Sequence, residues 1–139
     1  MTKKYWLLKS EPSTWSWEDQ VKSKIDIWDG VRNYQARNNL IKMKKGDLCF
    51  FYHSVNEKSV IGIVEVHKEH YPDPTDKSKK FVAIDVKALR KLKHPVTLDR
   101  IKINTKLNDI PLIKQSRLSV MPLTSKEFNE ILKLSNTNE

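Results

Sequence analysis

Two apolar runs joined by a short polar turn constrain the fold of this chain more than any other feature. Residues 47–54 read DLCFFYHS and residues 59–67 read SVIGIVEVH. The first run is apolar at every position from Leu48 to Tyr52, which is typical of a strand that is buried on both faces. The VNEK turn between the runs predicts that they pair as antiparallel neighbours. Gly62, within the second run, predicts a bulge or a bend of the kind found in barrels.

Shorter patterns predict the remaining elements. Strands are expected over 3–10, 25–28 and 81–88, and helices are expected after Ser16, over 33–43 and after Thr124, where TSKE fits a capping box. Residues 71–80 combine prolines with charged and hydroxyl side chains, so they are expected to form a loop. A short amphipathic piece is expected over 95–103, and SRLSV at 116–120 is the most strand-like part of a mixed segment over 112–123.

The order of these elements predicts the fold class. Strands dominate the middle of the chain and helices its flanks, which is typical of a small curved sheet or barrel with helices packed on it. A chain of 139 residues is long enough to bury about two-thirds of its unfolded surface in one core. We therefore expect one mixed α/β domain over residues 1–139, with a short polar tail at 135–139.

The charge balance favours a polyanionic partner. Lysine and arginine number 26 against 17 aspartate and glutamate, which gives a net charge of +9 and a pI near 9.6. Such an excess favours nucleic acid, because neutralising phosphates releases condensed counterions. The cations are mostly lysine, however, and a lysine-rich surface can also reflect overall composition and solubility.

The cysteine content and the apolar runs predict a compartment. Cys49 is the single cysteine, so no internal disulfide can form, as is usual in a reducing compartment. The apolar stretch at 5–8 is too short for a signal peptide, and no run approaches the roughly twenty apolar residues of a membrane span. We expect a soluble, cytoplasmic monomer that does not bind membranes.

The sequence offers little for catalysis. The four histidines do not combine with Cys49 in a zinc-ligand spacing. Cys49 and His53 would lie about 13 Å apart along a strand, which is too far for proton transfer. The three glycines form no phosphate-binding loop. We therefore predict a protein that is not an enzyme, with no catalytic residues, no metal and no cofactor.

One pattern keeps a nuclease as a less favoured alternative. Pro72-Asp73 followed by Asp85-Val86-Lys87 resembles the PD…(D/E)xK signature, in which two acids hold magnesium and lysine polarises water. Asp85 and Lys87 lie on an expected strand. Prolines on both sides of Asp73 favour a flexible loop there, whereas a nuclease needs a fixed carboxylate.

Residues 28–40, WDGVRNYQARNNL, are the best candidate for a binding site. Trp28 ends a strand-like run and is followed at once by Asp29-Gly30, where the chain must turn. An indole at a strand end can wall a pocket and stack on a base, although it can equally cover a core. Gly30 would let the backbone approach a ligand closely. The other tryptophans, Trp6, Trp15 and Trp17, are assigned to the core.

Five segments together resemble the EVE domain, a family that includes the thymocyte nuclear proteins. They read KYWLLKSEP at 4–12, WSWEDQ at 15–20, WDGVRNYQARNNLIKMKKGDLCFFYHS at 28–54, YPDPT at 71–75 and SRLSV at 116–120. The resemblance extends from about Tyr5 to Ile131. It implies a PUA-like pseudo-barrel of about five to six strands with flanking helices, related to the ASCH and YTH domains.

The resemblance also implies a function. EVE and YTH domains are associated with reading modified bases, so this chain is expected to bind DNA or RNA that carries one, without catalysis of its own. LLKS at 7–10 and Trp28 resemble the lysine-serine strand end and the first cage tryptophan of YTH domains. By this likeness Trp28 stacks on the base, while Ser10 and Asn33 bond its edge. The VNEK turn lacks the further wall of a methyladenine cage, which favours a modified cytosine over methyladenine.

The same likeness assigns the remaining walls and the phosphate contacts. The wall opposite Trp28 is expected from Tyr52, His53 and Ser54, and closure of the pocket from Ser116, Arg117 and Leu118. Phosphates are expected to meet Lys9, Arg32 and Arg37, and the amide of Asn38 could read a base edge.

Three questions stay open at this point. The protein could instead bind ordinary structured RNA, with the pocket unused for modified bases, and a separate nuclease partner could act on the reading. The basic run could hold a nucleic-acid backbone or form a solvated strand edge. That run comprises Lys77, Lys79, Lys80, Lys87, Arg90, Lys91 and Lys93.

Overall fold

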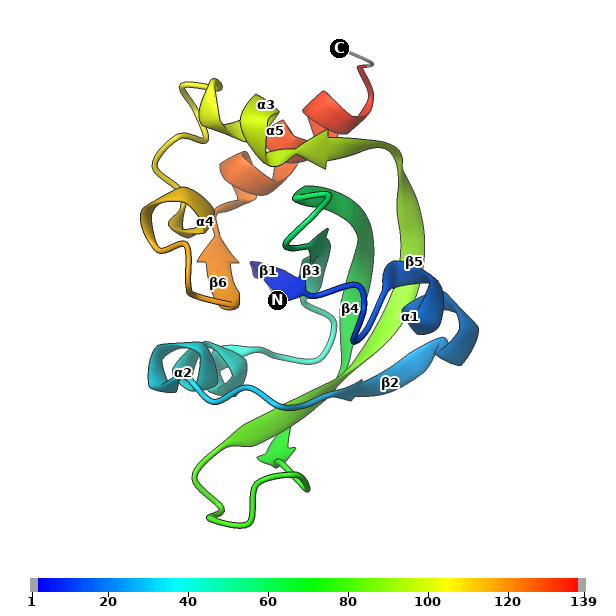
Figure 1. Cartoon of the computed structure of the whole chain (residues 1–139), viewed down its shortest axis with the longest axis vertical. Helices are drawn as coiled ribbons and strands as arrows, with labels where there is room; N and C mark the ends of the chain where they lie inside the picture. Colours follow the sequence, from blue (N-terminus) through cyan, green and yellow to red (C-terminus); the bar gives the residue numbers. More distant parts are fainter. Residues whose placement is uncertain (1–2, 138–139) are drawn as a thin grey trace.

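The computed structural model describes residues 3–137 and contains one open, curved sheet of six strands with helices around it (Figure 1). The elements, in chain order, are β1 (Tyr5–Ser10), α1 (Trp17–Ser23), β2 (Ile25–Trp28), α2 (Tyr34–Lys42), β3 (Leu48–His53), β4 (Ser59–Pro72), β5 (Val82–Thr97), α3 (Leu98–Lys102), α4 (Pro111–Lys114), β6 (Val120–Leu123) and α5 (Ser125–Ser135). The expected mixed α/β fold is confirmed. The sheet is curved but not closed.

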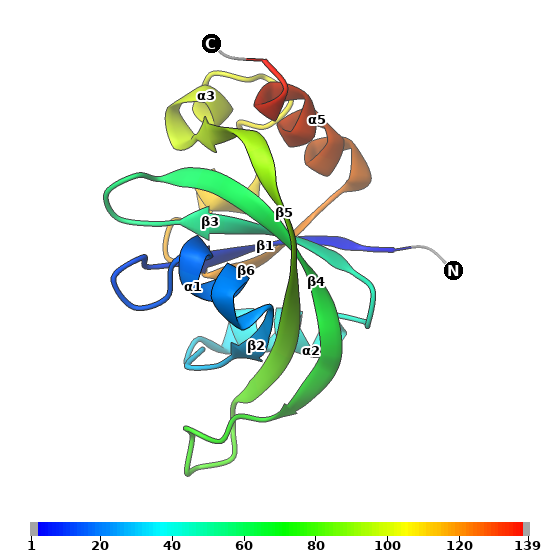
Figure 2. The same cartoon turned by 90° about the vertical axis from the view of Figure 1, so that its right-hand side faces the viewer.

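The strand order is β2-β5-β4-β3-β1-β6. β1 pairs with β3 in parallel, and the other strand pairs of this sheet are antiparallel. β4 and β5 run together along the length of the molecule, with α3 and α5 at one end and the β4–β5 turn at the other (Figure 2). This arrangement brings the ends of β1 and β2 to the same side of the domain, where the candidate site lies.

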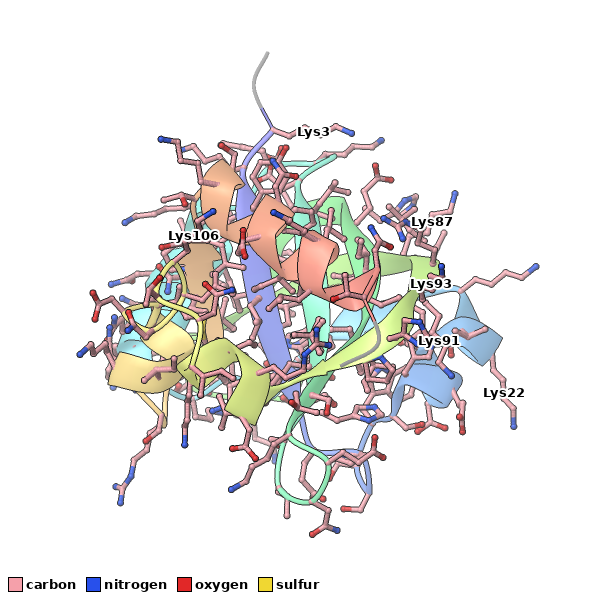
Figure 3. All side chains as sticks on the ribbon, turned by 90° about the horizontal axis from the view of Figure 1, so that it is seen from above. Lys3, Lys22, Lys87, Lys91, Lys93 and Lys106 are labelled. Carbon is pink, nitrogen blue, oxygen red and sulfur yellow. The ribbon has the colours of Figure 1, made fainter. Side chains whose placement is uncertain are left out.

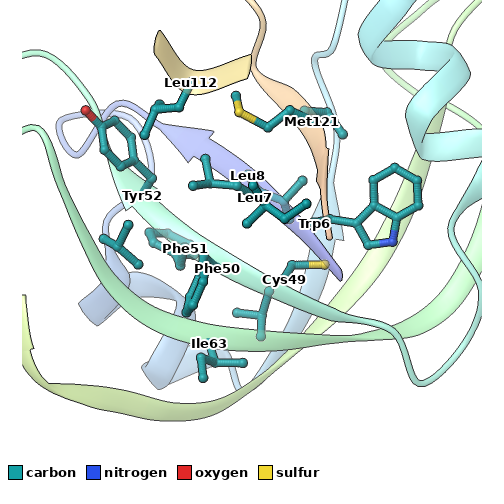
Figure 4. Close-up of a cluster of buried hydrophobic side chains, with 14 of the residues drawn as sticks. Trp6, Leu7, Leu8, Cys49, Phe50, Phe51, Tyr52, Ile63, Leu112 and Met121 are labelled. Atoms are coloured by element: carbon teal, nitrogen blue, oxygen red, sulfur yellow. The ribbon is translucent and has the colours of Figure 1, made fainter. Parts of the chain in front are cut away.

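The predicted hairpin over 47–54 and 59–67 is confirmed as β3 and β4, which pair in antiparallel register from Leu48 to His53. Cys49, Phe50 and Phe51 are fully buried, as expected for a strand with cover on both faces. Figure 4 shows these side chains packed between β1 and β4, with Leu7 and Met121 nearby. The described core forms one continuous cluster.

Gly62 marks a close contact as well as an irregularity. The β3–β4 register shifts between Phe51 and Tyr52, and the β4–β5 register shifts between Val60 and Gly62, so the predicted bulge is confirmed. A Cβ at Gly62 would lie 2.5 Å from Cη2 of Trp17. The missing side chain therefore makes room for the indole that packs α1 onto the sheet.

The expected helices begin at side-chain caps. Ser16 and Asp19 form a capping box at the start of α1, and Thr124 and Glu127 form another at the start of α5. Each pair satisfies two backbone donors that would otherwise lack partners. The hydroxyl of Thr137 donates to the carbonyl of Leu134, and residues 138 and 139 of the predicted tail lie outside the described residues. No helix within residues 3–137 has the length and apolar character needed to cross a membrane.

Four expected boundaries were wrong. β4 continues to Pro72 and β5 from Val82 to Thr97, because backbone pairing extends well beyond the apolar part of each strand. Pro72 is tolerated because it ends its strand. Within the expected amphipathic piece, the strand ends at Thr97 and α3 follows at once. Strand β6 begins only at Val120, so most of SRLSV precedes it.

Candidate functional site

A pocket of about 470 Å³ opens between the ends of β1 and β2; we call it the Trp28 pocket. It has contributions from the end of β1 with the loop after it, from β2 with the loop after it, and from one residue before β6. The lining residues are Lys9, Ser10, Glu11, Thr14, Trp15, Asp26, Ile27, Trp28, Asp29, Gly30, Val31 and Ser119. The wall thus combines two indoles with lysine, hydroxyl and carboxylate groups.

Trp28 belongs to the pocket and to the core at once. It is the last residue of β2, paired with Ile84 of β5, and only 7% of it is exposed. Its ring meets Phe51 edge-on, with ring centroids 5.6 Å apart. Because the rest of the indole lines the pocket, the two interpretations of Trp28 from the sequence both describe part of its environment.

Trp15 was assigned to the core from the sequence, and this is confirmed in part, because Trp15 packs against the buried cluster. It is only partly buried and lines the Trp28 pocket. Its Nε1 donates to Oε1 of the buried Gln20 at 2.9 Å, and its carbonyl accepts from the hydroxyl of Ser10. The signal was present in the sequence: Ser16 caps α1, so Trp15 lies outside the helix while Trp17 begins it.

The loop after Trp28 is held in place by a distant carboxylate. The N–H of Gly30 donates to Oδ2 of Asp73 at 2.8 Å, and Nη1 of Arg32 lies 3.1 Å from the same oxygen. Gly30 has a φ of 81°, and a Cβ there would meet nothing within 4 Å. Its left-handed backbone explains the glycine, and the close approach of a ligand expected from the sequence stays a prediction.

Asp73 is fixed and buried, so the expectation of a flexible loop at this residue was wrong. It is 2% exposed, and its Oδ1 accepts from the backbone N–H and the hydroxyl of Thr75. Burial opposes ionisation of Asp73, but hydrogen bonds from Thr75, Gly30 and Arg32 outweigh it and lower the pKa of the carboxyl. The ionised carboxylate of Asp73 therefore supports the loop that lines the Trp28 pocket.

Asp29 differs from Asp73 in its electrostatics. Burial, followed by the like charge of Asp73, raises the pKa of the Asp29 carboxyl above its ordinary value. The side chain of Asp29 lines the Trp28 pocket directly after the indole. No other residue among those described donates a hydrogen bond to this carboxylate, which leaves it available to a ligand.

Lys9 and Ser10 form the opposite side at the end of β1. Ser10 is 7% exposed, and its carbonyl accepts from the N–H of Ser54 at 2.9 Å. Nζ of Lys9 donates to the carbonyl of Ser116 at 2.6 Å, and burial lowers the pKa of Lys9. Lys9 lines both the Trp28 pocket and a second hollow beside it.

The predicted opposite wall lies outside the Trp28 pocket. Tyr52 and Ser54 line the second hollow, of about 280 Å³, together with Lys9 and Ser116. Burial, with Asp99 nearby, raises the pKa of Tyr52 to about 12.

His53, which lies between Tyr52 and Ser54 in the sequence, is buried and contacts the start of α1. Its Nε2 accepts from the backbone N–H of Trp17 at 3.0 Å, and its Nδ1 lies 3.6 Å from Oε2 of Glu57. The acceptor role of Nε2 places the ring proton of the neutral imidazole on Nδ1. This histidine satisfies a backbone donor at the start of α1.

A third hollow, of about 290 Å³, brings together Asn33, Ser116, Arg117 and Leu118. Asn33 caps α2, since its Oδ1 accepts from the N–H of Ala36 at 2.9 Å. Ser116 lines both the second and the third hollow. The predicted base-binding residues other than His53 are therefore distributed over three adjoining depressions. Lys9 is shared by the Trp28 pocket and the second hollow, and Ser116 by the second and third hollows.

Both predicted phosphate-binding arginines make contacts within the protein. Arg32 donates to Asp73 and to Oγ1 of Thr75. Arg37 donates to Oδ1 of Asn38 and to the carbonyl of Lys80. These contacts order the guanidinium groups, and the exposed part of Arg32 still faces solvent, with 42% of its side chain accessible.

The residues of the nuclease pattern have other partners. Asp73 is committed to Gly30, Arg32 and Thr75, and Asp85 accepts from the hydroxyl of Tyr71. Among residues 3–137 no three side chains of the metal-ligating types gather in one place. This arrangement does not favour magnesium-dependent cleavage.

Comparisons with known proteins agree with the fold and the sequence pattern. The model of the EVE domain family matches residues 4–134. Thymocyte nuclear protein 1 of Mus musculus is 36% identical over 168 residues, covering 96% of this chain and 74% of that protein. A protein of Rhodopseudomonas palustris solved by NMR is 47% identical, with a TM-score of 0.91, covering 98% of this chain and 95% of that one.

Two further structures define the wider setting. Human THYN1 protein, solved in complex with DNA that contains 5-methylcytosine, is 34% identical with a TM-score of 0.90, covering 99% of this chain and 100% of that one. An ASCH protein of Zymomonas mobilis has a TM-score of 0.59 at 13% identity, which shows a shared fold alone. Family model, relatives and structures all cover most of the chain, and this protein belongs to the EVE domain family.

Proposed function

We propose that this protein binds nucleic acid that carries a modified base, and that a modified cytosine in DNA enters the Trp28 pocket. The observation that carries the proposal is the combination of two indoles, Trp15 and Trp28, with the available carboxylate of Asp29 in one pocket of about 470 Å³. The DNA complex of human THYN1, which shares this fold at 34% identity, supports the choice of base. The proposed activity is binding, and no catalytic step is needed.

The proposed pose uses stacking for affinity. A base taken out of the helical stack can lie against an aromatic face, a contact worth about 1–3 kcal/mol per base. Trp28 is fixed for this role by its edge contact with Phe51 and by its place at the end of β2. Trp15 is held by the hydrogen bond to Gln20.

Asp29 would supply selectivity for cytosine. Cytosine presents an amino donor at N4, where thymine presents the O4 acceptor, and aspartate is a suitable partner for the donor. 5-Methylcytosine and thymine share the 5-methyl group, so this edge is where a reader must tell them apart. A carboxylate that faces O4 would repel it, which disfavours thymine.

The adjoining hollows would accommodate the flanking strand. Lys9 lies between the Trp28 pocket and the second hollow, and Ser116 lies between the second and the third. We propose that phosphates and sugars on either side of the base contact Lys9, Arg32, Arg37 and Arg117, and that Asn33, Tyr52, Ser54 and Leu118 line this path.

The experiment compares Trp28→Ala with Trp6→Ala in binding to an oligonucleotide with one 5-methylcytosine. Both tryptophans are buried, at 7% and 3% exposed, but Trp6 does not line the Trp28 pocket. After correction for folded protein, Trp28→Ala should lose about 5- to 150-fold in affinity, which corresponds to about 1–3 kcal/mol. Trp6→Ala should bind normally.

Three further oligonucleotides complete the test at one salt concentration. The first has unmodified cytosine in place of 5-methylcytosine, the second has thymine there, and the third is a structured RNA without modification. Equal affinity for all four would leave only counterion-driven binding and would refute a modified-base reader. Preference for the RNA would favour an RNA-binding function. Asp29→Asn should narrow the preference for 5-methylcytosine over thymine, because an amide can accept from N4 or donate to O4.

A further inference from the structure

A hollow of about 540 Å³ lies between α1 and β5 and shares no lining residue with the Trp28 pocket. We call it the α1–β5 hollow. Its apolar lining consists of Trp17, Val21, Ala88 and Leu89. Val21 and Leu89 are each 45% exposed, although their side chains are large and apolar. The base-binding proposal does not use this surface.

A bulge in β5 creates the exposed apolar lining. Arg90 pairs with Ile63 of β4 and Ala88 pairs with Val64, so Leu89 is an extra residue without a partner. An extra residue breaks the alternation of side chains between the two faces of a strand. Leu89, Arg90 and the following residue are therefore all exposed in succession.

Four cations surround this lining. They are Lys24, at the end of α1, and Lys87, Arg90 and Lys91 of β5. The lining contains no acidic side chain, and the ion pairs formed within residues 3–137 involve none of the four cations. Glu65 is the cross-strand neighbour of Lys87 but forms no ion pair with it. Figure 3 shows Lys87, Lys91 and Lys93 on the side of the molecule formed by α1 and β5.

The position of Lys24 is held firmly against the strand. Its carbonyl accepts from the N–H of Ala88 at 2.8 Å, which joins the two walls of the hollow. Its backbone has φ 64° and ψ −64°, a strained γ-turn conformation for a residue with a side chain. The cation is thus placed by the backbone at the mouth of an apolar depression.

We propose that the α1–β5 hollow binds an acidic segment of a partner protein, with one bulky apolar side chain on the Val21–Leu89 lining and carboxylates on the surrounding cations. Charge complementarity favours an acidic partner, and the apolar lining favours a protein segment over a nucleic-acid backbone. A phosphate chain would cover Val21 and Leu89 without an apolar group to offer them.

The test uses an array of 12-residue peptides made of aspartate and glutamate around one central leucine, isoleucine, methionine, phenylalanine or tryptophan. A matched set carries serine at the centre. At least one apolar-centred peptide should bind the full chain at least tenfold more tightly than its serine counterpart. Absence of binding across the array, or equal binding of the serine set, would overturn the proposal.

Matched variants locate the contact. Lys91→Glu and Lys22→Glu change the net charge equally, but Lys22 lies on α1 outside the hollow. Lys91→Glu and Leu89→Ser should each lower the affinity for the peptide at least tenfold, whereas Lys22→Glu should change that affinity less than twofold. An equal loss in the two lysine variants would show non-specific attraction and refute the site.

The same variants test whether the hollow binds other ligands and whether it contributes to base binding. The affinity of the protein for duplex DNA and for anionic phosphatidylserine vesicles should not fall more in Lys91→Glu than in Lys22→Glu. A larger response of either one would assign the hollow to nucleic acid or to lipid and overturn the peptide proposal. Lys91→Glu and Leu89→Ser should retain the preference for 5-methylcytosine, so a failure of the base-binding proposal would appear independently.

Discussion

Replacing Asp73 by asparagine should loosen the loop that follows Trp28 and weaken the fold at the same time. The carboxylate has two oxygens, one for Thr75 and one for Gly30 and Arg32. Asparagine offers one oxygen and one NH2 group. If the NH2 group turns toward Gly30 and Arg32, it faces two donors. If it turns toward Thr75, the backbone N–H of Thr75 loses its acceptor, while the hydroxyl can rotate to accept.

The cost can be estimated from these contacts. A hydrogen bond to a charged group is worth about 1.5–3 kcal/mol, and the partly exposed Arg32 contributes near the lower end. We expect a loss of about 2–3 kcal/mol in the free energy of unfolding. With an unfolding entropy of about 2.1 cal/mol/K per residue over 139 residues, the melting temperature should fall by about 7–10 °C.

The assay measures melting by circular dichroism and binding to the 5-methylcytosine oligonucleotide on the same preparations. Asp73→Asn should lose affinity even when fully folded, because a neutral amide holds the loop of Asp29 and Gly30 less firmly than the carboxylate does. Asp76→Asn is the control: Asp76 accepts hydrogen bonds within its own loop, from Ser78 and Phe81, and none from the Trp28 pocket. An Asp73→Asn protein with wild-type melting and affinity would refute the role of this carboxylate.

The difference in melting temperature between wild type and Asp73→Asn should depend on pH in one direction. The pKa of Asp73 is lower in the folded protein than in the unfolded chain, so its contribution to stability is present above the unfolded pKa of about 3.9. That contribution is lost as pH falls through the folded pKa. The melting difference between wild type and Asp73→Asn should therefore be full at pH 6–7 and shrink below about pH 4.

Three other changes give simple outcomes. Gly62→Ala should cost about 1–3 kcal/mol in urea unfolding, because its Cβ would lie 2.5 Å from the Trp17 ring; an unchanged midpoint would mean that the ring moves freely. Asn33→Ala should cost about 1 kcal/mol by removing the cap of α2, with undiminished stability contradicting this. Lys24→Gly should melt at or above the wild-type temperature, since glycine relieves the positive φ, and a clear fall in melting temperature would show that the side chain stabilises the fold.

Local patterns predicted most of the secondary structure. The hairpin of β3 and β4, the caps at Ser16 and Thr124 and the helix after Asn33 depend on residues within a few positions of one another. Periodicity and cap chemistry act over such distances, so the sequence shows them directly. The length of β5 depends on backbone pairing, which apolar periodicity does not record.

The candidate site was harder to predict because its geometry depends on distant contacts. Gly30 and Asp73 are 43 positions apart, and nothing in either segment announces the hydrogen bond that joins them. The part of Trp15 in the pocket was missed because an aromatic residue near a helix fits a core as well as a pocket. The family resemblance identified Trp28 and Ser10, which the structure does bring together, but it could not separate the three hollows.

The position of β1 between β3 and β6 decides when folding of the sheet can be completed. β1 lies between β3 and β6, and Tyr5 pairs with Leu123 near the other end of the chain. During synthesis, one side of β1 stays unpaired until β6, more than 100 positions later, has left the ribosome. Because closing so long a loop precedes the gain from pairing, docking of β6 should be a late and slow step of folding. A chain in which β6 has not yet docked would expose that edge to other molecules, so this protein should depend on chaperones most before β6 pairs with β1.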